Sequence, residues 1–374
     1  QSIISLCQSH AKHRINMAKK ICILALITIL FSLGSPWVNP AFASLPNGNR
    51  LKDPYAILRN SLPIEQKELR ELQNKLEDTS EDLRGSRWSA ISKATSRSQF
   101  LVSNKKNQIL DSMPAENKEN ASNLLSNLKE ELDELGQIAN EKNKVSFLDV
   151  RRQSLKTIDD IESLLITKNF PYQIPSEYNN LPRLLGRANV EIKTSKGNMN
   201  AIIDGYNAPL TAGAFIDLSM KGFYDGLPIN RAEEFFILQT GDPKGETIGY
   251  IDPDNNELRR VPLEIRTSSL EDTLYGETFE DVGLYTETPV LPFATLGTLG
   301  WAHSDTDLND GSSQFFFFLY EAELNPAGRN LIDGRNAAFG YVIEGSEILN
   351  KLGVDDKIIS ITVLNGSENL KLKA

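Results

Sequence analysis

Cysteine and histidine, which supply thiol nucleophiles, imidazole bases and zinc ligands, are scarce in this 374-residue chain, with two Cys and three His. All of them lie in the first 43 residues except His303. Beyond residue 43 a zinc site built from Cys and His is therefore excluded, and a Ser-His-Asp hydrolase would have to use His303. No phosphate-binding or dinucleotide-binding glycine motif occurs either. We expect chemistry that needs no metal, no cofactor and no covalent nucleophile.

The first 43 residues read as upstream residues followed by a cleaved secretory signal. Met17 is a plausible start, Lys19 and Lys20 form a short basic region, the apolar run Ile21–Leu33 follows, and Ala41–Ala43 is a small-residue cleavage site. The alternative is an uncleaved membrane anchor. That run has 13 residues, whereas spanning a bilayer needs about 20, so we expect an exported protein.

The charge balance excludes one class of partner. Cleavage after Ala43 removes four of the 40 Lys and Arg and none of the 50 Asp and Glu, which leaves 36 minus 50, or −14. Such an acidic chain lacks the basic footprint of a nucleic-acid-binding protein. No polybasic stretch that would bind anionic lipid is present, so we expect membrane contact only through protein partners.

Glycine content divides the chain into two parts that should differ in secondary structure. Residues 44–185 contain three glycines and residues 186–374 contain 20. Because glycine disfavours helices and suits tight turns, the first part should be helical and the second rich in strands. Leucine and isoleucine recur at helical spacing across residues 69–76, 125–138 and 155–165, with breaks near Pro63, Gly85, Pro114 and 140–144. About four amphipathic helices joined in this way predict an antiparallel bundle over residues 44–170.

A proline-containing polar stretch at residues 171–187 predicts a linker. From Ala188 the apolar period changes to two, with a turn at Ser195–Gly197. A helix should follow, capped by Asn207 and ending before Gly222, and a second, shorter helix should begin after Ser346. The remaining short apolar runs predict a closed antiparallel barrel over residues 188–374.

Four ordered motifs over residues 188–365 resemble those of the cyclophilins. Pro228–Pro243 resembles the signature Phe-His-Arg followed by Phe-Met-Ile-Gln-Gly-Gly-Asp, and Gly311–Phe316 resembles Gly-Ser-Gln-Phe-Phe. Leu331–Gly340 resembles Leu-Asp-Gly-Lys-His-Val-Val-Phe-Gly, and Val190–Gly226 is similar to the family's opening. The architecture, with Val261–Arg266, is similar to the thylakoid-lumen cyclophilins of plants and cyanobacteria that carry an N-terminal helical bundle.

This resemblance implies an α+β multidomain protein, with the bundle followed by a closed eight-stranded antiparallel barrel capped by two helices. It implies peptidyl-prolyl cis-trans isomerisation of X–Pro bonds, proline-containing polypeptide segments as substrates, and residence in the thylakoid lumen or periplasm. It also implies a role in assembling photosystem II and contact with its subunits. We expect no bound metal ion and no cofactor.

The resemblance also assigns the site residues. Arg231 corresponds to the catalytic arginine and Gln239 to the side chain that steadies the substrate backbone. The substrate-binding residues that it implies are Phe236, Ile237, Ala302, His303, Phe316, Ile332 and Asn336. The apolar residues among them are equally consistent with barrel core, and His303 with a turn.

Three departures from the family pattern leave a second reading open. Asn230 and Asn336 stand where the family has histidine, and the expected tryptophan is missing, with Leu324 or Leu331 nearby. The alternative function is therefore a catalytically weak binding and assembly factor; a third is that the bundle regulates the site. The long acidic connection 244–295 should fold beside the site and contribute to partner choice.

Overall fold

The structure is a computed structural model that describes residues 52–166, 170–320 and 330–373. The predicted signal at residues 1–43 lies outside these ranges. The described residues all belong to one compact unit, residues 47–374. No helix within the described ranges combines the length and the apolar character that crossing a bilayer requires.

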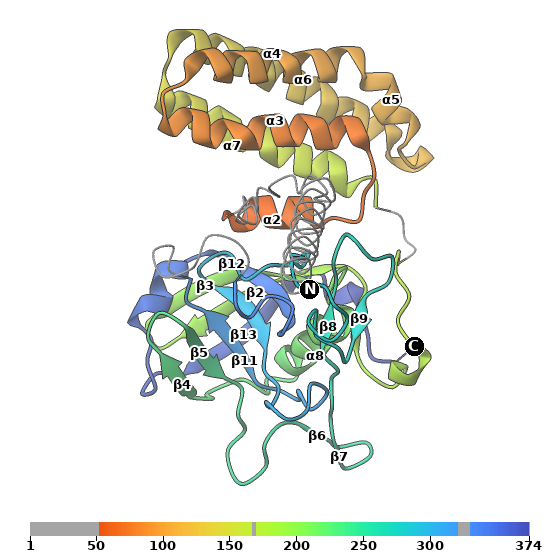
Figure 1. The fold of residues 1–374 in the computed structure, drawn as a ribbon, viewed down its shortest axis with the longest axis vertical. Helices are drawn as coiled ribbons and strands as arrows, with labels where there is room; N and C mark the ends of the chain where they lie inside the picture. Colours follow the sequence, from red (N-terminus) through yellow and green to blue (C-terminus); the bar gives the residue numbers. More distant parts are fainter. Residues whose placement is uncertain (1–51, 167–169, 321–329, 374) are drawn as a thin grey trace, which may run out of the picture. The chain divides into compact units, whose positions relative to one another are not determined.

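Helices occupy the first part of the described chain (Figure 1). The four long ones begin and end close to the predicted breaks: α3 (Lys67–Arg84), α4 (Trp88–Asn104), α6 (Lys118–Glu141) and α7 (Lys144–Ser163). Gly85 ends α3, and Lys142 ends α6 in a left-handed conformation with φ of 58°. The short helix α5 (Lys106–Asp111) and a 3-10 turn (Ala115–Asn117) lie on either side of Pro114. The prediction of a helical N-terminal region is confirmed.

One apolar core is shared by these helices. The predicted leucine stripes are buried in it, among them Leu72 of α3, Leu128 of α6 and Ile158 of α7, each with no exposed surface. Helix α4 packs against α3 and α6, and α7 packs against α6 and α3. Burial of one face of each helix is what the 3.6-residue spacing requires.

The short helix α2 (Pro54–Asn60) joins a different core. Ile57 and Leu58 are buried among the strand-bearing residues, and the Leu58 carbonyl accepts a hydrogen bond of 2.6 Å from the Arg187 guanidinium. Arg59 of the same helix pairs with Glu77 of α3 at 3.1 Å. Residues 54–60 fall within the range predicted for the bundle, 44–170.

Eight antiparallel strands form the main sheet, in the order β13-β2-β3-β12-β10-β11-β5-β4. Their bounds are β2 (Arg187–Thr194), β3 (Gly197–Asp204), β4 (Ile229–Glu233), β5 (Ile237–Thr240), β10 (Thr298–Trp301), β11 (Phe315–Phe318), β12 (Ala338–Glu344) and β13 (Ile358–Asn365). The prediction of a closed barrel was wrong: β13 and β4 are the two edges of the sheet. The edges approach each other where these strands begin, through an isolated bridge between Pro228 and Lys357 and the hydrogen bonds that flank it, such as that from the Ile358 amide to the Leu227 carbonyl at 2.9 Å.

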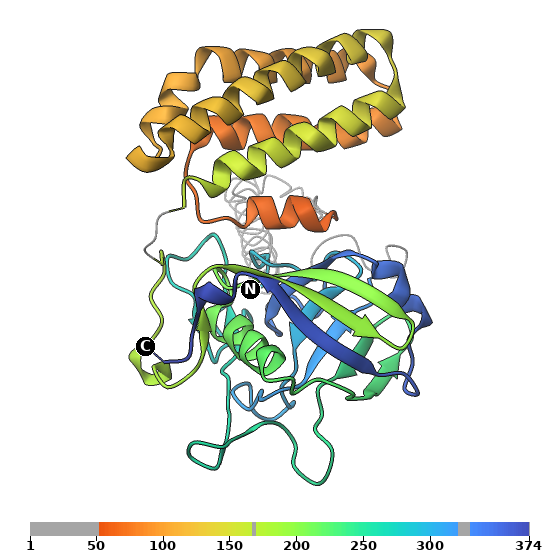
Figure 2. The same cartoon turned by 180° about the vertical axis from the view of Figure 1, so that it is seen from behind.

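The β2–β3 hairpin follows the predicted period of two. Val190, Ile192, Ala201 and Ile203 are buried, and Thr194 pairs with Gly197 across a two-residue turn. Figure 2 shows this hairpin beside β13, with which β2 pairs.

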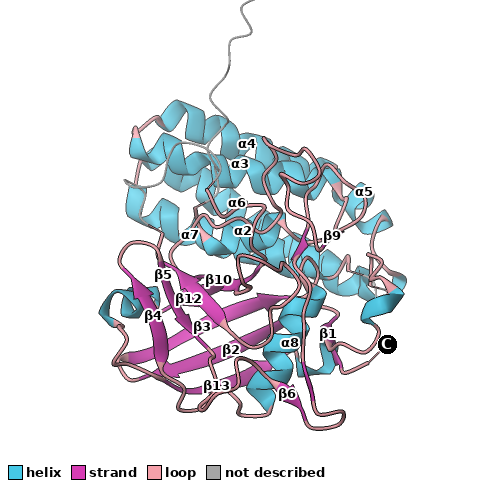
Figure 3. Cartoon of the chain, turned by 60° about the horizontal axis from the view of Figure 1, so that its bottom comes forward, coloured by secondary structure: helices cyan, strands magenta, loops and turns pink. Residues whose placement is uncertain are grey.

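Helix α8 (Pro209–Met220) packs against this part of the sheet (Figure 3). Its residues from Pro209 to Ser219 are all buried, so the helix is enclosed by protein and not amphipathic. Ala208, and not Asn207, occupies the N-cap position. The predicted second helix is a 3-10 helix, Ser346–Lys351, which buries Ile348.

The predicted linker and the long connection both contain ordered strands. Between residues 171 and 187, β1 (Arg183–Leu184) pairs with β14 (Leu370–Lys371). The connection 244–295 forms two small hairpins, β6 (Ile251–Asp252) with β7 (Glu257–Leu258) and β8 (Glu264–Ile265) with β9 (Leu274–Tyr275). Its last part returns to the main sheet, where Phe293 is buried.

Candidate functional site

Three of the predicted site residues form one row across neighbouring strands. Arg231 of β4 lies opposite Gln239 of β5, and Gln239 lies opposite Phe316 of β11. Directly opposed residues of antiparallel strands point to the same face of a sheet. The fold therefore gathers a cation, an amide and an aromatic ring on one surface.

The apolar residues next to this row differ in exposure. Phe316 is 5% exposed and Ile237 is 4% exposed, whereas Phe236 is half-buried. Phe236 meets the edge of Phe318 with ring centroids 6.3 Å apart, and its carbonyl accepts a hydrogen bond from the Leu319 amide at 2.8 Å. The half-buried Phe236 ring could therefore contact a small apolar ligand, with the buried Ile237 and Phe316 beside it.

Two features hold the Phe316 ring in place. Phe293, from the end of the long connection, stacks on it with centroids 5.8 Å apart and planes at 14°. A Cβ added to Gly300, its cross-strand partner on β10, would lie 2.2 Å from the ring. Only glycine leaves room for the ring against this strand. The connection thus reaches the site through Phe293.

The other predicted residues lie on the segments after β10 and before β12. The Ala302 amide donates to the Gln314 carbonyl at 3.1 Å, and the Asn336 amide group lies 3.3 Å from His303 Nε2. Ile332 is half-buried against the core. Leu331, one of two candidates for the missing tryptophan, is 76% exposed, and Leu324 lies outside the described residues.

The His303 ring is engaged by main-chain carbonyls. Its Nδ1 lies 2.8 Å from the Ser304 oxygen and its Nε2 lies 3.1 Å from the Arg335 oxygen. A neutral imidazole donates to one of these acceptors and an imidazolium to both. The ring therefore ties two loops together, which agrees with the alternative reading of His303 as a turn residue.

Gln314 is a central residue that the sequence analysis did not single out. Its Oε1 accepts hydrogen bonds from Gln239 Nε2 at 2.7 Å and from Asn230 Nδ2 at 3.2 Å. Its own Nε2 donates to Asp242 at 3.2 Å. The orientation of the Gln239 amide is thus set by Gln314. The available signal was its place inside the Gly311–Phe316 motif.

Arg231 carries the fixed positive charge of the site. Its Nε and one terminal nitrogen donate to Glu233 Oε1 at 2.7 Å and 2.5 Å, and its side chain is 49% exposed. Arginine stays charged at every working pH and presents several N–H donors in one plane. Within the described ranges no cluster of three or more His, Cys, Asp or Glu is arranged to hold a metal.

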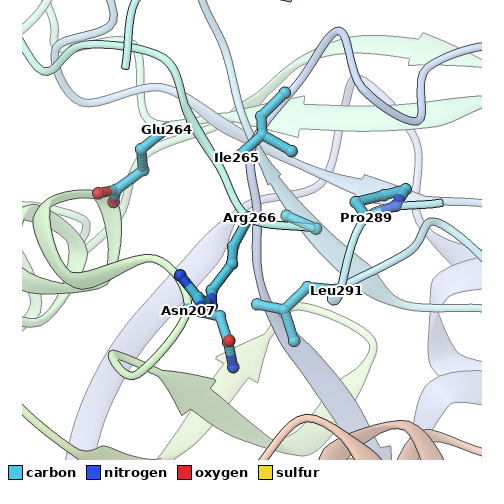
Figure 4. A pocket seen from close by; sticks show the side chains of 7 residues that line it. Asn207, Glu264, Ile265, Arg266, Pro289 and Leu291 are labelled. Carbon is cyan, nitrogen blue, oxygen red and sulfur yellow. The ribbon is translucent and has the colours of Figure 1, made fainter. Parts of the chain in front are cut away.

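A small cavity lies apart from this row (Figure 4). Residues from four segments line it, among them Asn207, Glu264 and Leu291. Glu264 is 1% exposed, and burial raises the pKa of its carboxyl to about 7. Its Oε2 and the Asn207 Oδ1 have no hydrogen-bond partner among the residues that the structure describes.

Comparison with known proteins adds to this geometry. Residues 189–362 match the family described as cyclophilin type peptidyl-prolyl cis-trans isomerase/CLD. A putative thylakoid lumen peptidyl-prolyl cis-trans isomerase of Synechocystis sp. is 42% identical, with 94% of each chain covered. This chain belongs to the cyclophilin-type peptidyl-prolyl cis-trans isomerases.

Further similarities cover both parts of this cyclophilin. Residues 53–166 match the description "Peptidyl-prolyl cis-trans isomerase CYP38-like, PsbQ-like domain". The chloroplastic isomerase CYP38 of Arabidopsis thaliana is 37% identical, covering 89% of this chain and 78% of the relative. A solved cyclophilin of Cryptosporidium parvum, studied with the dipeptide Ala-Pro, is 22% identical and covers 47% of this chain and 99% of that chain, with a TM-score of 0.33.

Proposed function

We propose that this cyclophilin accelerates rotation about X–Pro bonds in exported proteins, with Arg231 and Gln239 as the polar groups that act on the substrate. The observation that supports this is the single row formed by Arg231, Gln239 and Phe316. The proline ring binds at Phe236, Ile237, Phe316 and Ile332, and the peptide main chain lies along Ala302, His303 and Asn336.

The chemistry follows from the electronic structure of the amide. The C–N bond has partial double-bond character, with a barrier of about 18–20 kcal/mol, and unaided isomerisation takes on the order of 10–100 s. At the twisted transition state the nitrogen lone pair is no longer delocalised, so an N–H donor directed at it binds the transition state more tightly than the planar ground state. Arg231 supplies this donor, while Gln239 holds the neighbouring backbone.

The cellular setting is part of the proposal. We infer export by a cleaved signal and residence in the thylakoid lumen. The description of the Synechocystis relative as a thylakoid lumen isomerase supports the second inference. The resemblance to bundle-bearing lumenal cyclophilins extends this to assembly of photosystem II, with its subunits as partners. We also infer a division into an antiparallel bundle at 44–170, a linker at 171–187 and a cyclophilin domain at 188–374.

A second candidate is a binding and assembly factor that uses the same surface with little turnover. The substitution of Asn230 and Asn336 for histidine and the exposed Leu331 favour it. A proline-isomerisation assay on the full-length chain and on Arg231→Ala separates the two. We expect Arg231→Ala to lower kcat/KM by about 10²-fold, as loss of a transition-state donor does. No acceleration by the unmodified chain, with peptide binding retained, would favour the binding factor.

A further inference from the structure

Glu233 lies at the edge of the site, in the short stretch of Pro228–Pro243 between Arg231 and Phe236 that corresponds to no residue of the family signature. It is the last residue of β4 and follows Arg231 by two positions, so both side chains point to the same face. Its cross-strand partner is Ile237, which in turn pairs with Phe318 of β11. Glu233 therefore stands in the row next to that of Arg231, Gln239 and Phe316.

The contact between Glu233 and Arg231 occupies one edge of the guanidinium. Both the Nε and a terminal nitrogen of Arg231 donate to the same oxygen, Oε1 of Glu233. These are two of the five N–H donors of the guanidinium, so a substrate carbonyl or twisted amide nitrogen that approaches along this edge of Arg231 must displace the carboxylate. The two side chains are 49% and 46% exposed, and exposed ion pairs are weak enough to be exchanged. Substrate and carboxylate thus compete for one guanidinium.

We propose that Glu233 is a specificity-determining residue, which holds Arg231 in the free protein and favours proline segments that carry a Lys or Arg beside the X–Pro bond. When Arg231 turns to the substrate, the Glu233 carboxylate loses its cation at the rim of the site. A basic substrate side chain replaces that cation, whereas an acidic one adds a like charge. This inference rests on the proposed function, because it concerns the same site.

The charge of the whole domain acts in the same direction. Residues 188–374 carry 14 Lys and Arg against 29 Asp and Glu, a net charge of −15. A field of this sign attracts cationic segments and repels acidic ones, most strongly at low salt. A matched variant separates the effect of the overall negative charge from the effect of the Glu233 carboxylate. Glu234 is also exposed and carries the same charge, but it is Glu233 that pairs with Arg231.

The test uses the full-length chain, Glu233→Gln and Glu234→Gln. Three peptides of one sequence differ only in the residue after proline, which is Lys, Gln or Glu. Their affinities are measured by NMR titration and their isomerisation rates by exchange spectroscopy, at low and at physiological salt. Both variants lose one negative charge, but only Glu233→Gln releases Arg231.

We expect the unmodified chain and Glu234→Gln to prefer Lys over Gln over Glu, by about two- to five-fold per step, the range that exposed ion pairs span. Glu233→Gln should reduce the differences among the three peptides. It should also raise kcat/KM for the Gln peptide by about two- to five-fold. Equal effects of the two variants, or a slower reaction of Glu233→Gln on the Gln peptide, would overturn the proposal. If the affinities follow Glu233 but no peptide is isomerised, the specificity inference stands and the catalytic function fails. If all three peptides are isomerised at the same rate, the catalytic function stands and the specificity inference fails.

Discussion

The carboxylate of Glu264 accepts a hydrogen bond from the backbone N–H of Thr211, with 2.5 Å between Oε1 and the nitrogen. Thr211 lies in the first turn of α8, and Glu264 belongs to β8 of the long connection. The free N–H groups at a helix start favour a negative group, but full burial of the carboxylate opposes its ionisation. This contact fastens the connection to the helix beside the sheet.

The stability of the protein should fall as pH rises through the range in which Glu264 titrates. Burial raises the pKa of Glu264 to about 7, from a reference value of 4.5. The folded state therefore retains a proton that the unfolded state releases, so this contribution is complete below pH 4.5 and is lost by about pH 7. Its size is on the order of 3 kcal/mol. Urea unfolding at pH 5 and pH 8 measures it.

The matched variants for this prediction are Glu264→Gln and Glu271→Gln. Glutamine at 264 keeps an acceptor for the Thr211 N–H but does not titrate, so its unfolding free energy should change less between the two pH values. Glu271 is an exposed residue of the same connection, and its replacement should leave the pH dependence as it was. The same pH dependence in Glu264→Gln and the unmodified chain would contradict the assignment.

A second buried carboxylate should make Arg70 essential to the helical region. Glu162 is fully buried, and burial raises its pKa to about 8, with Arg70 as a cation 3.6 Å away. Above pH 8, where Glu162 is ionised, Arg70→Met leaves this carboxylate without a counter-charge, which costs about 3–5 kcal/mol. Adding Glu162→Gln should recover part of the loss. A double-mutant cycle by chemical denaturation measures the coupling, and strict additivity would show that the two groups do not interact.

Phe293 should control the position of the Phe316 ring. Phe293→Leu keeps an apolar side chain but removes the stacked face at 5.8 Å, so the Phe316 ring gains freedom. We expect about 1–2 kcal/mol of lost stability and a several-fold weaker affinity for proline peptides by NMR titration. Leu291→Ala, a buried change in the same segment, should cost stability without weakening the affinity. Equal affinity losses in the two variants would indicate a general loosening of the sheet.

Gln314 should act on catalysis through Gln239. Gln314→Ala removes the acceptor of the Gln239 amide, whose hydrogen bond measures 2.7 Å. We expect kcat/KM to fall by about tenfold, the equivalent of one hydrogen bond of about 1.4 kcal/mol, with a smaller change in unfolding free energy. Asn230→Ala, which loses only the 3.2 Å bond to the same oxygen, should be nearly neutral. A large effect of Asn230→Ala would place the orienting role on Asn230.

The local features of the molecule could be read from the sequence because solvent and core impose a period on nearby residues. The spacing of Leu69, Leu72 and Leu76 predicted the buried face of α3, and the alternation around Val190 and Ala201 predicted the β2–β3 hairpin. The ordered cyclophilin motifs supplied the candidate site residues. Neither kind of signal depends on where distant segments pack.

The remaining features join residues that are far apart in the chain, and only tertiary packing decides them. Gln239 and Gln314 are separated by 75 positions, and Glu264 and Thr211 by 53. The open edges of the sheet, the stacking of Phe293 on Phe316 and the burial of Glu264 follow from cross-strand register and close packing. Such contacts produce no repeating pattern in the sequence, because each of them is made only once. The packing of the whole core decides which distant segments come together.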